Sequence, residues 1–96
     1  MIKSFADKFT QDIYDGAESR YSRRLHPSLH SMARRLIDQI NAAPSLEFLR
    51  FPPGNHLEKL SGNLNDFWSL RINVRWRIIF QWKGDDASNV QIIDYH

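Results

Sequence analysis

The sequence predicts an α+β fold in which an N-terminal strand and helices pack on one face of a small antiparallel β-sheet. Apolar residues recur at helical spacing through the first half of the chain. From residue 67 onward they alternate with polar residues, and the short segment 73–75 divides the alternation into two strands joined by a tight hairpin. Helices followed by consecutive strands are typical of α+β proteins.

The composition is that of one domain, residues 1–96. A chain that is 42% hydrophobic and 12% aromatic has enough apolar surface to form a core. It contains no cysteine, which excludes disulfides and cysteine-ligated zinc and is consistent with a reducing compartment. No apolar run approaches the roughly 20 residues that span a bilayer, and the first residues lack the apolar stretch of a signal peptide. We therefore expect a cytoplasmic protein with no membrane partner.

The first predicted elements are a short strand and a short helix. Residues 2–5 form an apolar run suited to a strand. In the following helix Asp7 lies near the start and Gly16 just beyond the end, as helix termini favour. The helix is predicted because apolar residues recur at four-residue spacing: Phe5, Phe9 and Ile13.

A longer amphipathic helix is predicted over residues 25–42. Pro27 fits its first turn, where a missing N–H is tolerated, and Pro44 prevents much continuation past its end. Ser45 is expected to cap one further turn through Leu49. The apolar positions of the long helix form one stripe: Leu25, Leu29, Met32, Ala33, Leu36 and Ile40.

The second half of the chain is predicted to be strands. Residues 56–61 are expected to supply one strand, and residues 67–73 and 75–82 form the hairpin. Residues 83–89 have the composition of a turn-rich loop, and residues 90–94 form the last strand. Four aromatic residues on the apolar side of the hairpin are expected to be core, not a base-stacking platform: Trp68, Trp76, Phe80 and Trp82.

Basic residues are concentrated in two runs that contain no acid, residues 19–37 and 67–84. Such segregation favours one positive face and an anionic partner, although ordinary solvated arginines remain the alternative. Alternation along the hairpin is expected to place Arg71, Asn73, Arg75 and Arg77 on the open side of the sheet. The basic residues of the two runs are Arg20, Arg23, Arg24, Arg34 and Arg35, and then Arg71, Arg75, Arg77 and Lys83.

Several enzyme classes lack their sequence patterns. His26 and His30 are spaced i, i+4, but no carboxylate of a zinc-protease motif accompanies them, so no metal site is predicted. The four glycines are scattered singly, which gives no glycine-rich phosphate loop. A Gly-x-Ser-x-Gly elbow is also missing. We therefore expect no cofactor.

Cleavage of RNA without a metal requires less machinery. The substrate's 2′-hydroxyl is the nucleophile, so the protein supplies a base, an acid and cations for the developing charge. Arginine suits the phosphate and imidazole suits either proton transfer. Arg71, Arg75, Arg77 and Lys59 beside His96 would provide these groups.

The last three residues are Asp94, Tyr95 and His96. In an extended segment the first and third project to the same side. The negative charge of Asp94 and of the terminal carboxylate favours the imidazolium form, which suits His96 as a general acid. Tyr95 would stack on a base or position the phosphate. From these residues alone, a frayed terminus without a role remains the alternative.

Four segments carry a resemblance to a known family. They are "MIKSF" (1–5), "PPGNHLEKLSG" (52–62), "FWSLRINVRWRIIFQW" (67–82) and "IIDYH" (92–96). In this order they resemble the HigB-like toxins of the RelE/ParE superfamily, over essentially the whole chain. The Trp-Arg hairpin and the terminal Asp-Tyr-His are the most specific parts.

The resemblance implies a fold, an activity and partners. HigB-like toxins are small α+β proteins that cut messenger RNA on translating ribosomes. RelE-type cleavage proceeds by 2′-hydroxyl attack without a metal and leaves a cyclic phosphate. A HigA-like helix-turn-helix antitoxin holds the toxin inactive and represses the shared operon, so contact with DNA is expected only through the antitoxin.

The resemblance also implies site residues. Arg77, Asp94, Tyr95 and His96 are predicted to be catalytic, together with Arg71. The RNA phosphates are predicted to contact Lys59, Asn73, Arg75 and His56, and ribosomal RNA or the antitoxin to contact Arg23, Arg24, Arg34 and Arg35. Two positions depart from the family. Glu58 replaces a histidine, with His56 two residues earlier on the same face of a regular strand, and Asn73 replaces an arginine.

Two other functions remain as alternatives. ParE-like members of the same superfamily act on DNA gyrase without cutting RNA, and fold does not decide function. A simple nucleic-acid-binding module would use phosphate contacts alone. The presence of Arg77 together with Tyr95 and His96 favours the ribonuclease, because a gyrase inhibitor would not need these groups.

Overall fold

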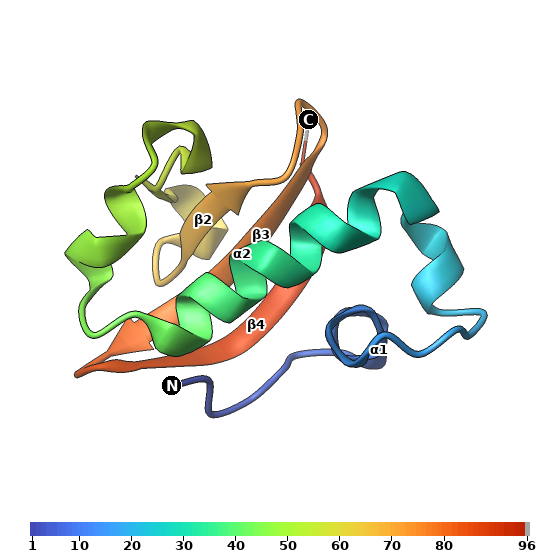
Figure 1. The fold of residues 1–96 in the computed structure, drawn as a ribbon. Helices are drawn as coiled ribbons and strands as arrows, with labels where there is room; N and C mark the ends of the chain where they lie inside the picture. The colour runs from blue at the N-terminus through green and yellow to red at the C-terminus, as the bar shows by residue number, and fades with distance from the viewer. Residues whose placement is uncertain (96) are drawn as a thin grey trace.

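The computed structural model describes residues 1–95 (Figure 1). Among these residues, helices α1 (Lys8–Asp15) and α2 (His30–Ala42) pack on one face of a four-stranded antiparallel sheet of order β1-β2-β3-β4. The strands are β1 (Glu58–Lys59), β2 (Trp68–Arg71), β3 (Trp76–Lys83) and β4 (Asp86–Asp94). The predicted α+β class is confirmed. Neither helix of this part of the chain is long and apolar enough to cross a membrane.

Five short 3-10 helices connect these elements within residues 1–95. They are η1 (Ser22–Arg24), η2 (Pro27–Leu29), η3 (Leu46–Arg50), η4 (Pro53–Asn55) and η5 (Gly62–Leu64). The turn predicted after Ser45 forms as η3, and it buries Leu49 completely. The Ser45 side chain makes no capping hydrogen bond, so packing of Leu49, and not the cap, stabilises this turn.

Helix α1 forms as predicted. The Asp7 carboxylate accepts a hydrogen bond from the backbone N–H of Thr10 at 2.8 Å, and Gly16 ends the helix in the left-handed region at φ 74°. Phe9 and Ile13 are buried against the sheet side. The Thr10 hydroxyl oxygen also accepts a hydrogen bond from the backbone N–H of Ile92 at 2.8 Å, which ties α1 to β4.

Helix α2 is shorter than predicted. It begins at His30, and the segment before it forms η1 and η2, not a continuous α-helix. His26 has an extended backbone and its ring nitrogen accepts a hydrogen bond from the Ser28 N–H at 3.1 Å, so Pro27 starts a separate 3-10 turn. The buried stripe also shifts, because Ile37 is fully buried while Met32 is 37% exposed.

The N-terminal segment pairs with β4 without forming a regular strand. Its contacts are two isolated parallel bridges, Ile2 with Ala87 and Phe5 with Val90. Between them Asn89 adopts a left-handed conformation at φ 53°, beside a register shift in the β3–β4 pair. This irregularity interrupts the ladder that a first strand at residues 2–5 would need.

The loop predicted at residues 83–89 is also shorter than expected. β3 continues to Lys83 and β4 already starts at Asp86, so the connection is a tight turn with Gly84 at φ 63°. The polar composition of residues 83–89 led to the prediction of a loop. The prediction was wrong because Ala87 in this segment pairs with Trp82 and is fully buried.

The core lies between the helices and the sheet. Phe80 is fully buried in it, and Trp68, Trp76 and Trp82 are partly buried and packed against it. The prediction that the aromatic residues of the hairpin belong to the core is confirmed. The other face of the sheet, which α1 and α2 do not cover, is called the open face below.

Candidate functional site

Two arginines lie opposite each other on the open face. In the antiparallel β2–β3 pair Arg71 is the register partner of Arg77, and Arg77 is the partner of Ile93 on β4. Neighbouring residues point to the other side, where Leu70 and Ile78 belong to the core. Like charges directly opposite each other repel, so this arrangement favours an anion between or above the two groups.

The surroundings of Arg77 hold its guanidinium in place. Its side chain is only 12% exposed, and Nη1 donates a long hydrogen bond of 3.4 Å to the Ser69 hydroxyl. Nη1 also lies 3.8 Å from Oε1 of Glu58, a carboxylate that is 53% exposed. This single, loose and solvated pair compensates only part of the charge of the two arginines.

Arg71 has less compensation than Arg77. Its Nε is buried and finds no hydrogen-bond acceptor among residues 1–95. A buried donor without an acceptor is unfavourable, and for a cationic group the penalty is larger. The pair Arg71–Arg77 therefore places two positive charges next to each other on the open face, and one buried donor of Arg71 is unsatisfied within residues 1–95.

Tyr95 lies on the same face as Arg77. The centroid of its ring is 5.1 Å from Cζ of Arg77, a distance at which a cation and an aromatic face attract each other. The ring remains 42% exposed. The expected grouping of Arg71, Arg77 and Tyr95 is therefore found, whereas His96 lies outside the described residues.

Asp94 and Arg75 form a separate pair. Asp94 is the register partner of Trp76, so it lies on the helix-covered side while Tyr95 lies on the open face. Arg75 donates two hydrogen bonds to its carboxylate, from Nε at 2.8 Å and from Nη2 at 2.6 Å. The hydrogen bond and the charge of Asp94 raise the pKa of Arg75. The expectation that Arg75 points out beside Arg77 is thus wrong, because its guanidinium is bound to Asp94.

Asn73 builds the hairpin. Its side-chain oxygen accepts hydrogen bonds from the backbone N–H groups of Arg75 at 2.9 Å and of Trp76 at 2.8 Å. Such an Asx turn stabilises a tight connection between strands. The oxygen of Asn73 is therefore occupied by the backbone, and this asparagine has a structural role in the turn.

Strand β1 is shorter than predicted, and this changes which residues reach the open face. Glu58 is the register partner of Ser69 and faces the open side, beside Arg77. Lys59 is the partner of Trp68 on the other side, with Nζ 5.2 Å from the centroid of the Trp68 ring, so it does not join the arginine pair.

His56 is not part of a strand. It has a left-handed backbone at φ 51° and ends η4, so it does not share a strand face with position 58 as expected. Sequence reasoning therefore missed the neighbour of Arg77 that the structure provides, Glu58. The alternation of strand faces could have identified Glu58. If residues 58–59 pair with β2, Glu58 lies opposite Ser69, on the same face as Arg77.

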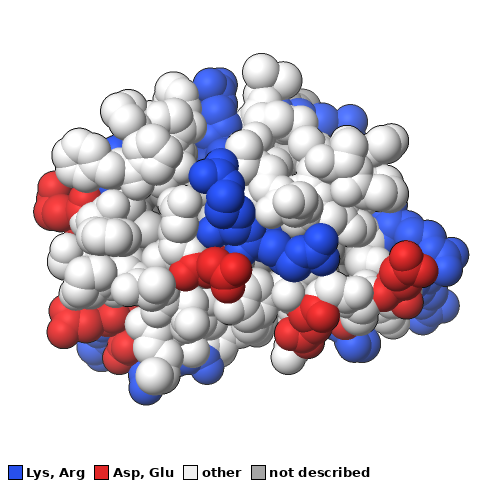
Figure 2. Space-filling view, in the orientation of Figure 1, with Lys and Arg blue, Asp and Glu red and all other residues white. Residues whose placement is uncertain are grey.

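The basic residues of the first run lie on the helix side. Figure 2 shows Lys and Arg side chains gathered over α2 in the middle of the face that Figure 1 presents. Arg35 donates to the Met32 sulfur at 2.8 Å, Arg24 lies 4.6 Å from the centroid of the Phe9 ring, and Arg34 reaches the Gly16 end of α1. The prediction of one positive face is wrong, because the two runs belong to opposite layers of the fold.

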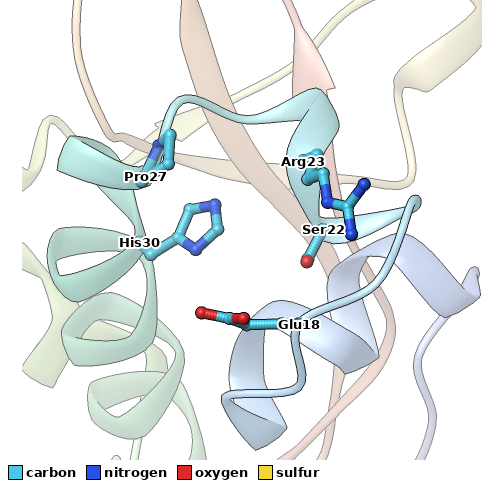
Figure 3. A pocket seen from close by; sticks show the side chains of 5 residues that line it. All are labelled: Glu18, Ser22, Arg23, Pro27 and His30. Atoms are coloured by element: carbon cyan, nitrogen blue, oxygen red, sulfur yellow. The ribbon is translucent and has the colours of Figure 1, made fainter.

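A pocket of about 300 Å³ lies between the α1–α2 connection and the start of α2 (Figure 3). Its lining is Glu18, Ser22, Arg23, Pro27 and His30, and the His30 Nε2 is 2.8 Å from the carbonyl oxygen of Leu25. Of the predicted site residues, Arg23 alone contributes to it. Within residues 1–95 no group of three or more His, Asp or Glu side chains is arranged to hold a metal ion.

Comparison with known proteins decides the family. The family model described as "RelE-like toxin of type II toxin-antitoxin system HigB" matches residues 3–96. The chain belongs to the HigB-like toxin family. The resemblance inferred from the four sequence segments is confirmed, and this HigB-like toxin is a RelE-like toxin of a type II toxin-antitoxin system.

Individual relatives agree with the family match. Toxin HigB-1 of Vibrio cholerae is 34% identical over 92 residues, which cover 96% of this chain and 95% of that protein. An uncharacterized protein of Haemophilus influenzae is 27% identical over 88 residues, covering 92% of this chain and 85% of that one. The solved YoeB-YefM complex from Staphylococcus aureus contains a chain with a TM-score of 0.62 at 17% identity, covering 100% of this HigB-like toxin and 98% of that chain. At this identity the likeness concerns the fold alone.

Proposed function

We propose that this toxin is a ribosome-dependent endoribonuclease that cuts translated messenger RNA and thereby inhibits translation and growth. The observation that carries the proposal is the Arg71–Arg77 pair on the open face, with the Tyr95 ring against Arg77. Two adjacent guanidinium groups match the oxygens of a phosphodiester, and an exposed aromatic ring matches the face of a base.

In the proposed reaction the substrate supplies the nucleophile. The 2′-oxygen bonds to phosphorus while the bond from phosphorus to the 5′-oxygen breaks, which gives a 2′,3′-cyclic phosphate and a free 5′-hydroxyl. Arg71 and Arg77 stabilise the negative charge that develops on the phosphate oxygens. Because the nucleophile is the substrate's own hydroxyl, the proposed chemistry requires no metal or other cofactor.

Two proton transfers accompany this exchange of bonds. A base removes the proton of the 2′-hydroxyl and an acid supplies a proton to the leaving 5′-oxygen. The Glu58 carboxylate, 3.8 Å from Nη1 of Arg77, is the acceptor that lies beside the phosphate-binding groups, and we assign it the role of base. We assign the role of acid to His96, a role for which its imidazole is suited.

The proposed partners follow from the family and the chemistry. A HigA-like helix-turn-helix antitoxin would neutralise the toxin and link it to DNA. The membership in a type II toxin-antitoxin family supports such a partner, and so does the similar fold in a complex of YoeB with YefM. The proposed substrate is messenger RNA on ribosomes in the cytoplasm. Basic residues of the helix side would contact ribosomal RNA or the antitoxin: Arg23, Arg24, Arg34 and Arg35.

The proposal is tested with purified protein in a reconstituted translation reaction. Primer extension on the message should reveal new 5′-hydroxyl ends inside codons, and these ends should require ribosomes. As a matched control, Arg50→Ala removes an exposed arginine paired with Glu47 in η3, away from the sheet, and should cleave like the wild type. An intact message together with inhibited DNA supercoiling by gyrase would instead support the ParE-like alternative.

A further inference from the structure

The hairpin between β2 and β3 contacts the end of β4 through Arg75. Arg75 directly precedes β3, and Asp94 is the last residue of β4, paired in register with Trp76. The two hydrogen bonds from Nε at 2.8 Å and Nη2 at 2.6 Å use both carboxylate oxygens of Asp94. This bidentate, charge-assisted geometry is stronger and more directional than a single contact between an ammonium and a carboxylate.

The main chain adds a second contact at the same place. The backbone N–H of Tyr95 donates to the carbonyl oxygen of Arg75 at 2.7 Å, which continues the β3–β4 ladder one residue past the strand. The guanidinium of Arg75 also lies 5.5 Å from the centroid of the Trp76 ring, which limits its freedom. Arg75 thus holds two successive residues of the last strand, one by its side chain and one by its backbone.

This contact has a consequence on the opposite face. Asp94 and Tyr95 point to opposite sides of the strand, so fixing Asp94 below the sheet fixes the direction of the Tyr95 ring above it. The ring lies 5.1 Å from Cζ of Arg77 although 42% of Tyr95 is exposed. A strand end without such a restraint would fray, and the ring would leave Arg77.

We propose that Arg75 is a positioning residue that, through Asp94, holds the end of β4 so that Tyr95 lies against Arg77. This inference rests on the proposed function in that the open face is where RNA is cut. It also changes the role predicted for Arg75. An arginine that gives two of its donors and its charge to Asp94 is a poor phosphate ligand, whereas it is well suited to restrain a strand end.

The direct test is amide hydrogen exchange of Tyr95 by NMR, which requires no RNA. Arg75→Ala should accelerate exchange of the Tyr95 amide at least about tenfold, because its hydrogen bond then opens with the fraying end. Arg75→Lys should give an intermediate rate, and the exchanged pair Arg75→Asp with Asp94→Arg should restore protection. Arg50→Ala is the matched control, and the buried amide of Ile78 reports that each variant remains folded.

The kinetic test separates positioning from phosphate binding. In the translation reaction, Arg75→Ala should lower the cleavage rate at saturating ribosomes by about 10- to 100-fold, with little change in the half-saturating concentration. A raised half-saturating concentration with an unchanged maximal rate would show Arg75 to be a phosphate ligand and would overturn the inference. Unchanged Tyr95 exchange in Arg75→Ala would overturn it as well.

Failure of the inference and of the proposed function can be told apart. If the wild-type toxin cuts no message, the ribonuclease proposal fails, while the exchange rates still decide whether Arg75 restrains Tyr95. If the wild type cuts but Arg75→Ala cuts equally well, the ribonuclease stands and the positioning role is wrong.

Discussion

Arg71 and Arg77 are direct register partners across β2 and β3, and the Nε of Arg71 is buried without an acceptor among residues 1–95. Side chains in such a position usually bear opposite charges or are apolar, because like charges across a strand pair are destabilising. The free toxin therefore retains an electrostatic repulsion that a bound anion relieves. An anion that binds the folded state and not the unfolded state raises the free energy of unfolding by mass action.

The first prediction concerns Arg71. Arg71→Met removes one charge and keeps an unbranched side chain, so it should raise the free energy of unfolding by about 0.5 kcal/mol in low salt. Inorganic phosphate should stabilise the wild type against urea more than chloride of equal ionic strength, and this difference should shrink in Arg71→Met. Equal stabilisation of both proteins by phosphate would contradict an anion site at this pair.

The second prediction concerns Arg77 and the chain end. Arg77→Ala should lower cleavage on ribosomes by about 10²- to 10³-fold, the range found when one stabilising donor is removed from a transition state. Deletion of His96 should also relieve toxicity, since we propose this residue as the general acid. Both variants should still co-purify with the antitoxin. Growth arrest by either variant at matched expression would show that the site is wrongly assigned.

The third prediction concerns Glu58. Glu58→Gln keeps the size of the side chain and removes its ability to take a proton, so the single-turnover cleavage rate should fall by about 10²-fold or more. Binding to ribosomes, measured by sedimentation, should be retained. If the rate is unchanged or higher, Glu58 is only a counter-ion of Arg77 and competes with the phosphate.

The fourth prediction concerns the hairpin. Asn73→Ala removes the acceptor for two backbone N–H groups, at 2.9 and 2.8 Å, and should lower the free energy of unfolding by about 1 to 2 kcal/mol in urea denaturation. Asn73→Asp keeps the acceptor and should lie close to the wild type in stability. Should the alanine variant be as stable as the wild type, the Asx turn contributes little.

The fifth prediction concerns Asp12 in α1. Hydrogen bonds from Lys8 and Ser19 lower the pKa of this buried carboxyl below its ordinary value. A group whose pKa is lower in the folded state stabilises the protein above its unfolded pKa, and this contribution is lost as the pH falls through the folded pKa. The wild type should therefore lose stability more steeply below about pH 4 than Asp12→Asn does. Thermal melting across this pH range measures the difference, and parallel curves would contradict it.

Much of the fold was predictable because local signals and packing agree. Asp7 and Gly16 mark the ends of α1, and the alternation of Trp76, Ile78 and Phe80 marks β3. The start of α2 was missed because the stripe of apolar residues continues through Leu25 and Leu29, while the backbone around Pro27 forms 3-10 turns. Periodicity does not distinguish a helix from tight turns that bury the same side chains.

The candidate site was predictable in part. Alternation correctly placed Arg71 and Arg77 on the face opposite the core. The terminal Asp-Tyr-His had already suggested Tyr95, and the family resemblance supported it. The positions of Glu58, Lys59 and Arg75 were not predictable, because they depend on the register of a two-residue strand and on an ion pair between residues 19 apart in sequence. Such long-range choices are set by tertiary packing and leave no local pattern.

The parallel bridges from Ile2 to Ala87 and from Phe5 to Val90 join residues 2–5 to β4, which lies far along the chain from them. Contacts between segments so far apart in sequence require closure of a long loop, and such contacts slow folding. The β4 edge of the proposed enzyme is therefore covered late in folding, by contacts that no local segment can form alone.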